Sequence, residues 1–200
     1  MWCDMEGVSG IVRWDQVSAG RPQYEEGRIL YTNEINAAVR GAKAAGATEI
    51  VVLDGHGAGG DCSFNSFVKT ALEPGAEYVF GHRWGCYIDL LRQGCDALLL
   101  PGAHAMAGTP DGVLCHTMSS ANWVNATING VKTGESGIIA AIAGSFDTPV
   151  VFVSGDAATC KEVAAFVGPT VVQACVKVGL NRFAARCLAP ADACALIERK

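Results

Sequence analysis

The sequence predicts a single α/β domain, a layered structure in which helices flank a mostly parallel β-sheet. Half of the 200 residues are hydrophobic and 18% are charged, which is enough apolar material for one substantial core. Short apolar runs of strand length alternate with longer stretches of helical periodicity, as in crossover β-α-β units. No repeat, low-complexity tract or linker interrupts this alternation. We therefore expect one domain spanning residues 1–200.

In the first half of the chain, the best-defined element is a helix over residues 24–45. Apolar residues recur there near helical spacing, and Gly46 follows where a helix would end. A short helix is expected near residues 84–92, ending at Gly94. Three short apolar runs have the length of buried strands; they are residues 48–53, 76–80 and 97–100.

The second half continues the alternation. Asn129-Gly130 is a strong turn signal for a β-hairpin. Asp156 is expected to cap a helix that runs to Val167, because a side-chain oxygen there can accept a free backbone N–H. The remaining expected elements are extended segments at residues 113–118 and 123–128, a helix at 134–143 and a strand at 150–153.

The most informative motif is Asp4-Met5-Glu6-Gly7, which places two carboxylates two positions apart with a glycine behind them. In an extended segment, such residues point to the same side, so both carboxylates would face one point while Gly7 lets the backbone turn away. Oxygens arranged in this way can bind a metal ion. Taken alone, the motif also occurs by chance in many solvated loops.

Three further ligand-type residues occur at matching places. His56 follows one expected strand and His104 follows another, so both belong at the carboxyl ends of strands, where open α/β sheets form their sites. Glu135 opens an expected helix. Each residue has an ordinary structural explanation: a loop histidine bonded to a carbonyl, or a carboxylate that complements a helix dipole. Together, two histidines and three carboxylates favour zinc or a similar divalent ion, and two ions if Asp4 bridges them.

Two other interpretations of the motifs are weaker. The run Gly55-His56-Gly57-Ala58-Gly59-Gly60 satisfies a dinucleotide-binding pattern, but no clear helix opens after it and no acidic residue ends the next strand. Cys115 and His116 could form a nucleophile and base pair, yet neighbours on a strand point to opposite faces unless the segment is bulged.

Composition excludes several classes of partner. The net charge of −5 and the absence of any Lys/Arg block argue against nucleic acid and anionic membrane surfaces. No run of eighteen apolar residues and no signal-peptide pattern is present, so we expect neither a membrane span nor secretion. The nine cysteines contain no Cys-x-x-Cys pair, which favours buried thiols in a reducing compartment. A cytoplasmic location is therefore expected.

These motifs together resemble the D-aminopeptidase family of binuclear zinc peptidases, of the dipeptide-transport-associated type. The resemblance covers most of the chain and rests on the following segments: Asp4-Met5-Glu6-Gly7, Asp54-Gly55-His56, Gly102-Ala103-His104-Ala105, Cys115-His116-Thr117-Met118, Asn129-Gly130 and Gly134-Glu135-Ser136-Gly137. It implies that Asp4, Glu6, His56, His104 and Glu135 bind two zinc ions, that Asp4 is shared between them, and that His116 is the catalytic residue.

The resemblance also implies an activity and an assembly. The expected reaction is hydrolysis of the N-terminal peptide bond of short peptides, foremost those of D-amino acids, in a homo-oligomer that forms a decamer of two stacked pentamers. Relative to the family, we expect the chain to be short before Asp4 and to lack a C-terminal portion. Two alternatives stay open: a metal-dependent hydrolase of another amide or ester, and a catalytically impaired metal-binding homologue.

Overall fold

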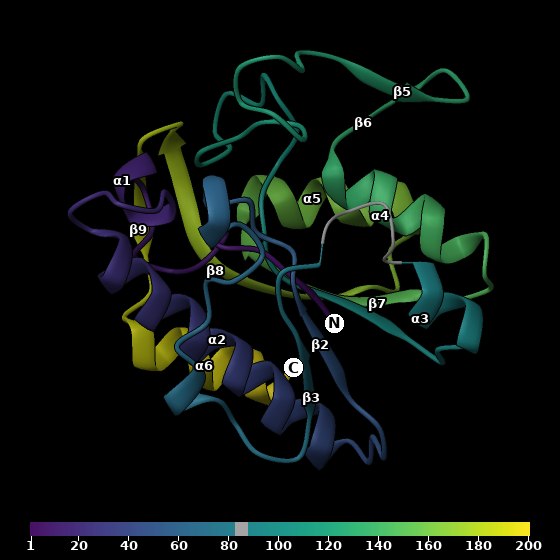
Figure 1. The fold of residues 1–200 in the computed structure, drawn as a ribbon. Helices are drawn as coiled ribbons and strands as arrows, with labels where there is room; N and C mark the ends of the chain where they lie inside the picture. The colour runs from purple at the N-terminus through teal and green to yellow at the C-terminus, as the bar shows by residue number, and fades with distance from the viewer. Residues whose placement is uncertain (83–87) are drawn as a thin grey trace.

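The computed structural model describes residues 1–82 and 88–200, and its regular elements form three layers (Figure 1). In the first half they are β1 (Trp2–Cys3), α1 (Trp14–Val17), α2 (Tyr24–Ala44), β2 (Val51–Asp54), the short 3-10 helices η1 (Gly60–Cys62) and η2 (Lys69–Ala71), β3 (Glu77–Val79), α3 (Ile88–Gln93) and β4 (Leu98–Ala103). In the second half they are β5 (Ala126–Ile128), β6 (Val131–Thr133), α4 (Glu135–Gly144), β7 (Val150–Asp156), α5 (Ala157–Val167), β8 (Val172–Asn181), β9 (Ala184–Cys187) and α6 (Pro190–Arg199).

The strands form two sheet segments and a separate hairpin. The first segment has the order β1-β2-β3 and is entirely parallel. The second has the order β4-β7-β8-β9, in which only β9 is antiparallel to its neighbour. The two segments meet beside β1 and β4, where the Asp4 N–H donates to the Pro101 carbonyl at 3.0 Å. The prediction of a mostly parallel α/β arrangement is confirmed, and the sheet is divided at this seam.

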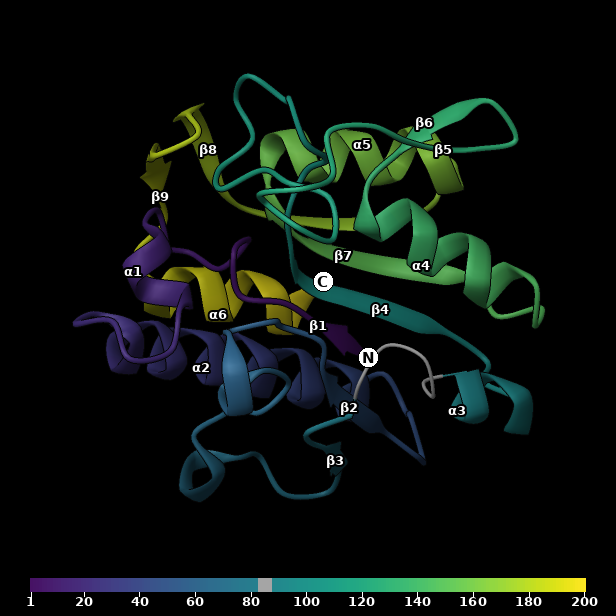
Figure 2. The same cartoon turned by 45° about the horizontal axis from the view of Figure 1, so that its top comes forward.

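Helices cover both faces of the second segment (Figure 2). Along β7 the side chains alternate between two cores, because successive residues of a strand point to opposite faces. Phe152 packs with α2 and α6 through residues such as Ala37 and Ile197, whereas Val153 packs in the core that includes Ile139 of α4 and Val163 of α5. Both faces of β7 are therefore buried from Phe152 onward, whereas Val151 near the start of the strand is exposed.

Most of the predicted elements are present. The helix predicted over residues 24–45 is α2, and Gly46 follows it with a positive φ of 96°. The Asn129-Gly130 hairpin joins β5 to β6, with positive φ at both turn residues, and Asp156 caps α5 by accepting the Thr159 N–H at 2.8 Å. Residues 84–87 of the predicted helix at 84–92 lie outside the described residues, and α3 accounts for its second half.

Two of the predicted extended segments differ from the structure. Residues 113–118 form turns and loop, with positive φ at Leu114 and Met118, and only residues 126–128 of the segment predicted at 123–128 are a strand. The apolar stretch Val113-Leu114-Cys115 is buried, but it packs as a loop and does not pair in a sheet, so the prediction of an extended segment at 113–118 is wrong. No helix within the described ranges is long and apolar enough to cross a membrane.

Candidate metal centre

The residues predicted to be ligands all lie at one edge of the sheets. Asp4 follows β1 directly, His56 lies two residues after β2, and His104 follows β4 directly. Glu135 is the first residue of α4. Because β1, β2 and β4 end at the junction of the two sheet segments, their carboxyl ends bring these side chains together. The predicted clustering at strand ends therefore agrees with the structure.

The segment that carries Asp4 and Glu6 is a turn, so the extended geometry expected from the sequence is wrong. Both carboxylates still converge, because backbone hydrogen bonds fix the turn against β4: the Gly7 N–H donates to the Gly102 carbonyl at 2.8 Å. A Cβ at Gly7 would collide with the Ala103 carbonyl oxygen, and one at Gly102 with that of Asp4. Gly7 is thus required for close packing against β4 and not for conformational freedom.

One half of the centre consists of Asp4, Glu6 and His56. His56 Nδ1 lies 2.9 Å from Asp4 Oδ1 and 3.1 Å from Glu6 Oε2. The other ring nitrogen, Nε2, lies 2.7 Å from the Val17 carbonyl oxygen. Since a carbonyl can only accept a hydrogen bond, Nε2 carries a proton and Nδ1 is left to face the carboxylates.

The other half consists of Asp4, His104, Glu135 and His116. His104 Nε2 lies 3.4 Å from Asp4 Oδ2 and 3.3 Å from Glu135 Oε1, and His116 Nε2 lies 3.4 Å from the same Glu135 oxygen. The two imidazole rings stack with centroids 4.0 Å apart. As in His56, each ring donates one N–H to a backbone carbonyl, but here the donor is Nδ1. His104 donates to Ala105, and His116 donates to Leu114.

Asp4 therefore lies between the halves, with one carboxylate oxygen facing each. The ligand atoms form two compact groups, in each of which they lie within 4.8 Å of one another. One group is Asp4, Glu6 and His104, and the other is His104, His116 and Glu135. The second group shows that His116 is close enough to act as a ligand, which the sequence interpretation did not assign to it.

Burial removes the polar atoms of this cluster from water. Glu6 Oε2 and His104 Nε2 are buried without a hydrogen bond, although ligand-type atoms lie within 3.4 Å of each. Burial and the Glu6 carboxylate raise the pKa of Asp4 to about 7. Although burial disfavours their charged forms, the nearby carboxylates raise the pKa of His56 and of His104 well above the ordinary value.

The residues present fit a divalent metal. Imidazole nitrogens with a fixed tautomer and carboxylate oxygens are ligands that zinc accepts, and the bond from each free N–H to a carbonyl is the usual outer support of a metal-bound histidine. A cation would also give a partner to the two orphaned buried atoms. Both the types of ligand atom and the two unsatisfied atoms therefore favour a divalent cation.

The two weaker interpretations fail in the structure. After the glycine-rich run comes only the three-residue η1, and Asp54, at the end of β2, accepts hydrogen bonds from the Ser66 and His56 N–H groups, so no helix N-terminus is available for a dinucleotide. The Cys115 thiol is buried and donates to the Thr109 carbonyl at 3.3 Å. Cys115 is thus a core residue and not a nucleophile.

The sequence profile of the D-aminopeptidase family matches residues 1–200 of this chain. The chain belongs to this family. A relative, the D-aminopeptidase of Bacillus subtilis (strain 168), is 35% identical over 201 residues, which cover 100% of this chain and 70% of the relative. A solved structure of the zinc-dependent D-aminopeptidase DppA from B. subtilis, described as a self-compartmentalizing protease, matches with a TM-score of 0.89 and 34% identity, covering 99% of this chain and 71% of that one.

Other residues hold this centre in place, and the sequence interpretation missed their roles. The second oxygen of the cap residue Asp156 accepts the Val113 N–H at 2.7 Å, which anchors the loop that leads to His116. Glu162 accepts the Met106 N–H at 2.8 Å, two residues after His104. Trp14 packs edge-on against His116, with ring centroids 5.6 Å apart. The sequence identified Asp156 as a helix cap. Its bond to Val113 joins residues 43 positions apart, and such a contact has no local signal in the sequence.

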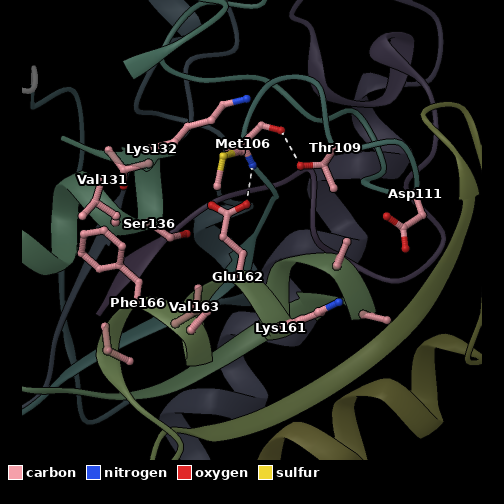
Figure 3. Close-up of a pocket in the computed structure, with 16 residues that line it drawn as sticks. Met106, Thr109, Asp111, Val131, Lys132, Ser136, Lys161, Glu162, Val163 and Phe166 are labelled. Atoms are coloured by element: carbon pink, nitrogen blue, oxygen red, sulfur yellow. Dashed lines mark hydrogen bonds between the residues drawn. The ribbon is translucent and has the colours of Figure 1, made fainter. Parts of the chain in front are cut away.

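A cavity of about 510 Å³ is lined by residues of α5, β6, the first turn of α4 and the loop at residues 106–111, and none of the six site residues lines it (Figure 3). Its lining includes Val131, Lys132, Phe166 and Glu162, with Glu162 directed toward Met106. The lining residues nearest in sequence to the centre are Met106, two residues after His104, and Thr133, Ser136 and Gly137, which flank Glu135. The chemistry of the centre therefore lies outside this cavity.

Proposed function

We propose that this chain is a zinc-dependent aminopeptidase that hydrolyses the N-terminal peptide bond of short peptides, foremost those with a D-amino acid at the N-terminus. The observation that carries the proposal is one cluster of five side chains in which two buried atoms, Glu6 Oε2 and His104 Nε2, have no hydrogen-bond partner. The five residues are Asp4, Glu6, His56, His104 and Glu135. Membership of the D-aminopeptidase family and the likeness to a zinc-dependent relative support the choice of metal and reaction.

The proposed centre holds two ions per chain. Asp4, Glu6 and His56 would bind one ion, and Asp4, His104 and Glu135 would bind the other, with Asp4 shared. The opposite orientation of the two Asp4 oxygens, toward His56 and toward His104, supports this division. Bound zinc ions make a water molecule acidic enough to serve as a nucleophile at neutral pH and polarise the scissile carbonyl.

The side chains of the centre divide into a deeply buried and an accessible set. His56, Glu6 and His104 have side chains 4% exposed or less, whereas Asp4, His116 and Glu135 are 13–16% exposed. Substrate would therefore approach from the side of His116 and Glu135. The carboxylates on that side offer a negative partner to the free amino group of a peptide, which suits an enzyme that acts at the N-terminus.

We assign His116 to the substrate and not to the metal. Its Nδ1 donates to the Leu114 carbonyl, which leaves Nε2 to face the centre, 3.4 Å from Glu135 Oε1. From there, Nε2 can take up a proton from the attacking water, give it to the leaving amine, or donate to the developing oxyanion. The backbone holds this position, because the His116 N–H donates to the Ala105 carbonyl at 3.3 Å, directly beside His104.

We further propose a cytoplasmic homo-oligomer, a decamer of two stacked pentamers, as the working form. The description of the DppA relative as self-compartmentalizing supports an oligomer. The impaired alternative has less support, because the N-terminal segment is anchored: the Met1 ammonium group donates to the Val51 carbonyl at 2.6 Å, and β1 pairs with β2.

The deciding experiment combines metal content with a substrate panel. We expect about two zinc ions per chain by elemental analysis, and faster hydrolysis of D-aminoacyl than of L-aminoacyl dipeptides. His104→Ala should lower the metal content, because the remaining carboxylates and His56 leave one ion with an incomplete shell. A zinc-loaded chain that cleaves simple esters but no peptide would favour the alternative of a metal-dependent hydrolase of another amide or ester. A chain without zinc under zinc-replete conditions would refute the proposal.

A further inference from the structure

Lys177 of β8 is buried, 2% exposed, and lies behind the turn that carries Glu6. Its ammonium group donates three hydrogen bonds, to the carbonyl oxygens of Glu6 at 2.6 Å, Val8 at 2.8 Å and Ile11 at 2.7 Å. A lysine ammonium has three protons, so all of them are used. Among the described residues, no carboxylate forms an ion pair with it. A buried charge held only by backbone carbonyls is costly and therefore needs an explanation.

The acceptors identify what this lysine holds. All three carbonyls belong to residues 6–11, the loop that continues from the Asp4-Met5-Glu6-Gly7 motif, and the first belongs to Glu6 itself. The irregularity in pairing between β7 and β8, at the step from Gly155 to Asp156, falls beside Lys177. Such irregularities redirect side chains out of the regular alternation of a strand. Lys177 thus lies where one ammonium group can bind three carbonyl oxygens that are not paired in a β-sheet.

The rest of the loop has further anchors. The Ser9 N–H donates to the buried Glu34 carboxylate at 2.8 Å, and the Ser9 hydroxyl donates to the Leu188 carbonyl at 2.7 Å. The Gly7 N–H is bound to β4, as described above. The Lys177 contact holds the Glu6 carbonyl, while the Gly7 N–H of the same peptide unit is held by β4, so the Glu6–Gly7 peptide is fixed at both its polar atoms. A shift of that carbonyl would move the Glu6 carboxylate relative to His56 Nδ1, 3.1 Å away.

We infer that Lys177 is a positioning residue for the metal centre, which fixes the backbone of Glu6 and so the half formed by Asp4, Glu6 and His56. This inference rests on the proposed zinc function. Lys177 touches neither substrate nor the ligand atoms, and its role is to orient a ligand, as outer-shell groups do in other metal sites. The half formed by His104 and Glu135 has no contact with Lys177.

The test compares zinc binding in the full chain with that of Lys177→Met and Lys177→Gln, with Lys161→Met as the control at an exposed lysine. Zinc is titrated against a chromogenic chelator, and cobalt is substituted to record the visible absorption, which reports ligand geometry. We expect one of the two ions to bind about 10- to 100-fold more weakly in Lys177→Met, with a changed cobalt spectrum, and Lys161→Met to match the parent. Lys177→Gln, whose amide can serve two carbonyls, should be intermediate.

The outcomes separate this inference from the proposed function. If the parent chain binds no zinc, the proposed function fails. If the parent binds two ions and both Lys177 variants bind them with parental affinity and spectrum, only the role of Lys177 is refuted. If neither variant folds even in excess zinc, Lys177 serves the fold and not the centre, and the inference is again overturned.

Discussion

At the scale of single residues, the three histidines of the centre share one arrangement. Each donates one ring N–H to a backbone carbonyl, at Val17, Ala105 or Leu114, and directs the other nitrogen toward carboxylates. The tautomer is therefore fixed before any ion binds. Two acceptors 2.9–3.4 Å apart repel each other unless a proton or a cation lies between them. A divalent cation can satisfy both acceptors at once without a proton, which is the physical reason why the arrangement suits a metal.

His116→Ala should separate binding from chemistry. We expect the variant to keep its zinc, because Asp4, His104 and Glu135 remain, and to lose roughly two or more orders of magnitude in peptide hydrolysis, the usual contribution of a general acid–base or oxyanion group. Elemental analysis and steady-state rates on a D-aminoacyl dipeptide measure both effects. Loss of an ion would make His116 a ligand, as its place in the second ligand group allows. A parental rate would remove it from the mechanism.

Glu34→Gln should reveal a pH-dependent cost of burial. Burial raises the pKa of Glu34 to about 7, against the opposing effects of the Ser9 N–H and the Lys177 charge. Because the folded chain holds this proton up to a higher pH than the unfolded chain, the parent loses stability as pH rises from the ordinary value of 4.5 to about 7. The stability of Glu34→Gln relative to the parent should therefore improve by about 2 kcal/mol between pH 5 and pH 8.

Urea unfolding of the metal-free parent and of Glu34→Gln at both pH values measures this difference. Glu26→Gln, at an exposed position of α2, is the control and should show no such trend. A larger relative gain for Glu34→Gln at pH 5 than at pH 8 would contradict the expected sign.

At the scale of elements, the centre depends on the seam between β1 and β4. There the chain after β1 runs so close to β4 that neither Gly7 nor Gly102 leaves room for a Cβ. The seam brings His104, at the end of β4, beside Asp4, at the end of β1. The two sheet segments thereby contribute to one site, and a short β1 of two residues is sufficient because β4 supplies the remaining hydrogen bonds.

Gly102→Ala should disrupt both the fold and the centre. Gly102 has a positive φ of 74°, and its new Cβ would collide with the Asp4 carbonyl. We expect a loss of about 2–4 kcal/mol in unfolding free energy together with weaker zinc binding. Gly144→Ala, at the end of α4 with nothing near its Cβ, should keep both properties. Denaturant unfolding and zinc titration of the two variants are the measurements. Equal behaviour of the two variants would contradict the role of the seam.

At the scale of the whole molecule, the exposed apolar residues are consistent with assembly. Trp123, Val124 and Val131, on and beside the β5–β6 hairpin that projects from the body of the domain, are 47%, 70% and 56% exposed (Figure 1). Exposed apolar side chains grouped in this way are typical of protein interfaces. The hairpin leads directly into α4, so an interface there would lie close to Glu135.

Sedimentation should therefore show a species much larger than the 20.8 kDa chain, and about ten times that mass for the proposed decamer. Val124→Asp should shift the distribution to smaller species, because a carboxylate would have to be desolvated in the interface. Gln93→Asp adds the same charge at an exposed polar position of α3 and should leave the assembly unchanged. A parent chain that sediments as a monomer at all concentrations would contradict the proposal.

The sequence by itself determined the fold class, most helices and strands, the family and the residues that converge at the centre. These features have local signals: apolar periodicity for α2 and β7, a capping residue for α5, and ligand-type side chains at strand ends. Tertiary structure decided the seam at Gly7 and Gly102, the tautomers of the three histidines, the loop at 113–118 and the contact from Lys177 to Glu6. Each of these features depends on atoms brought together from distant parts of the chain. Such contacts produce no periodic pattern in the sequence from which they could be predicted.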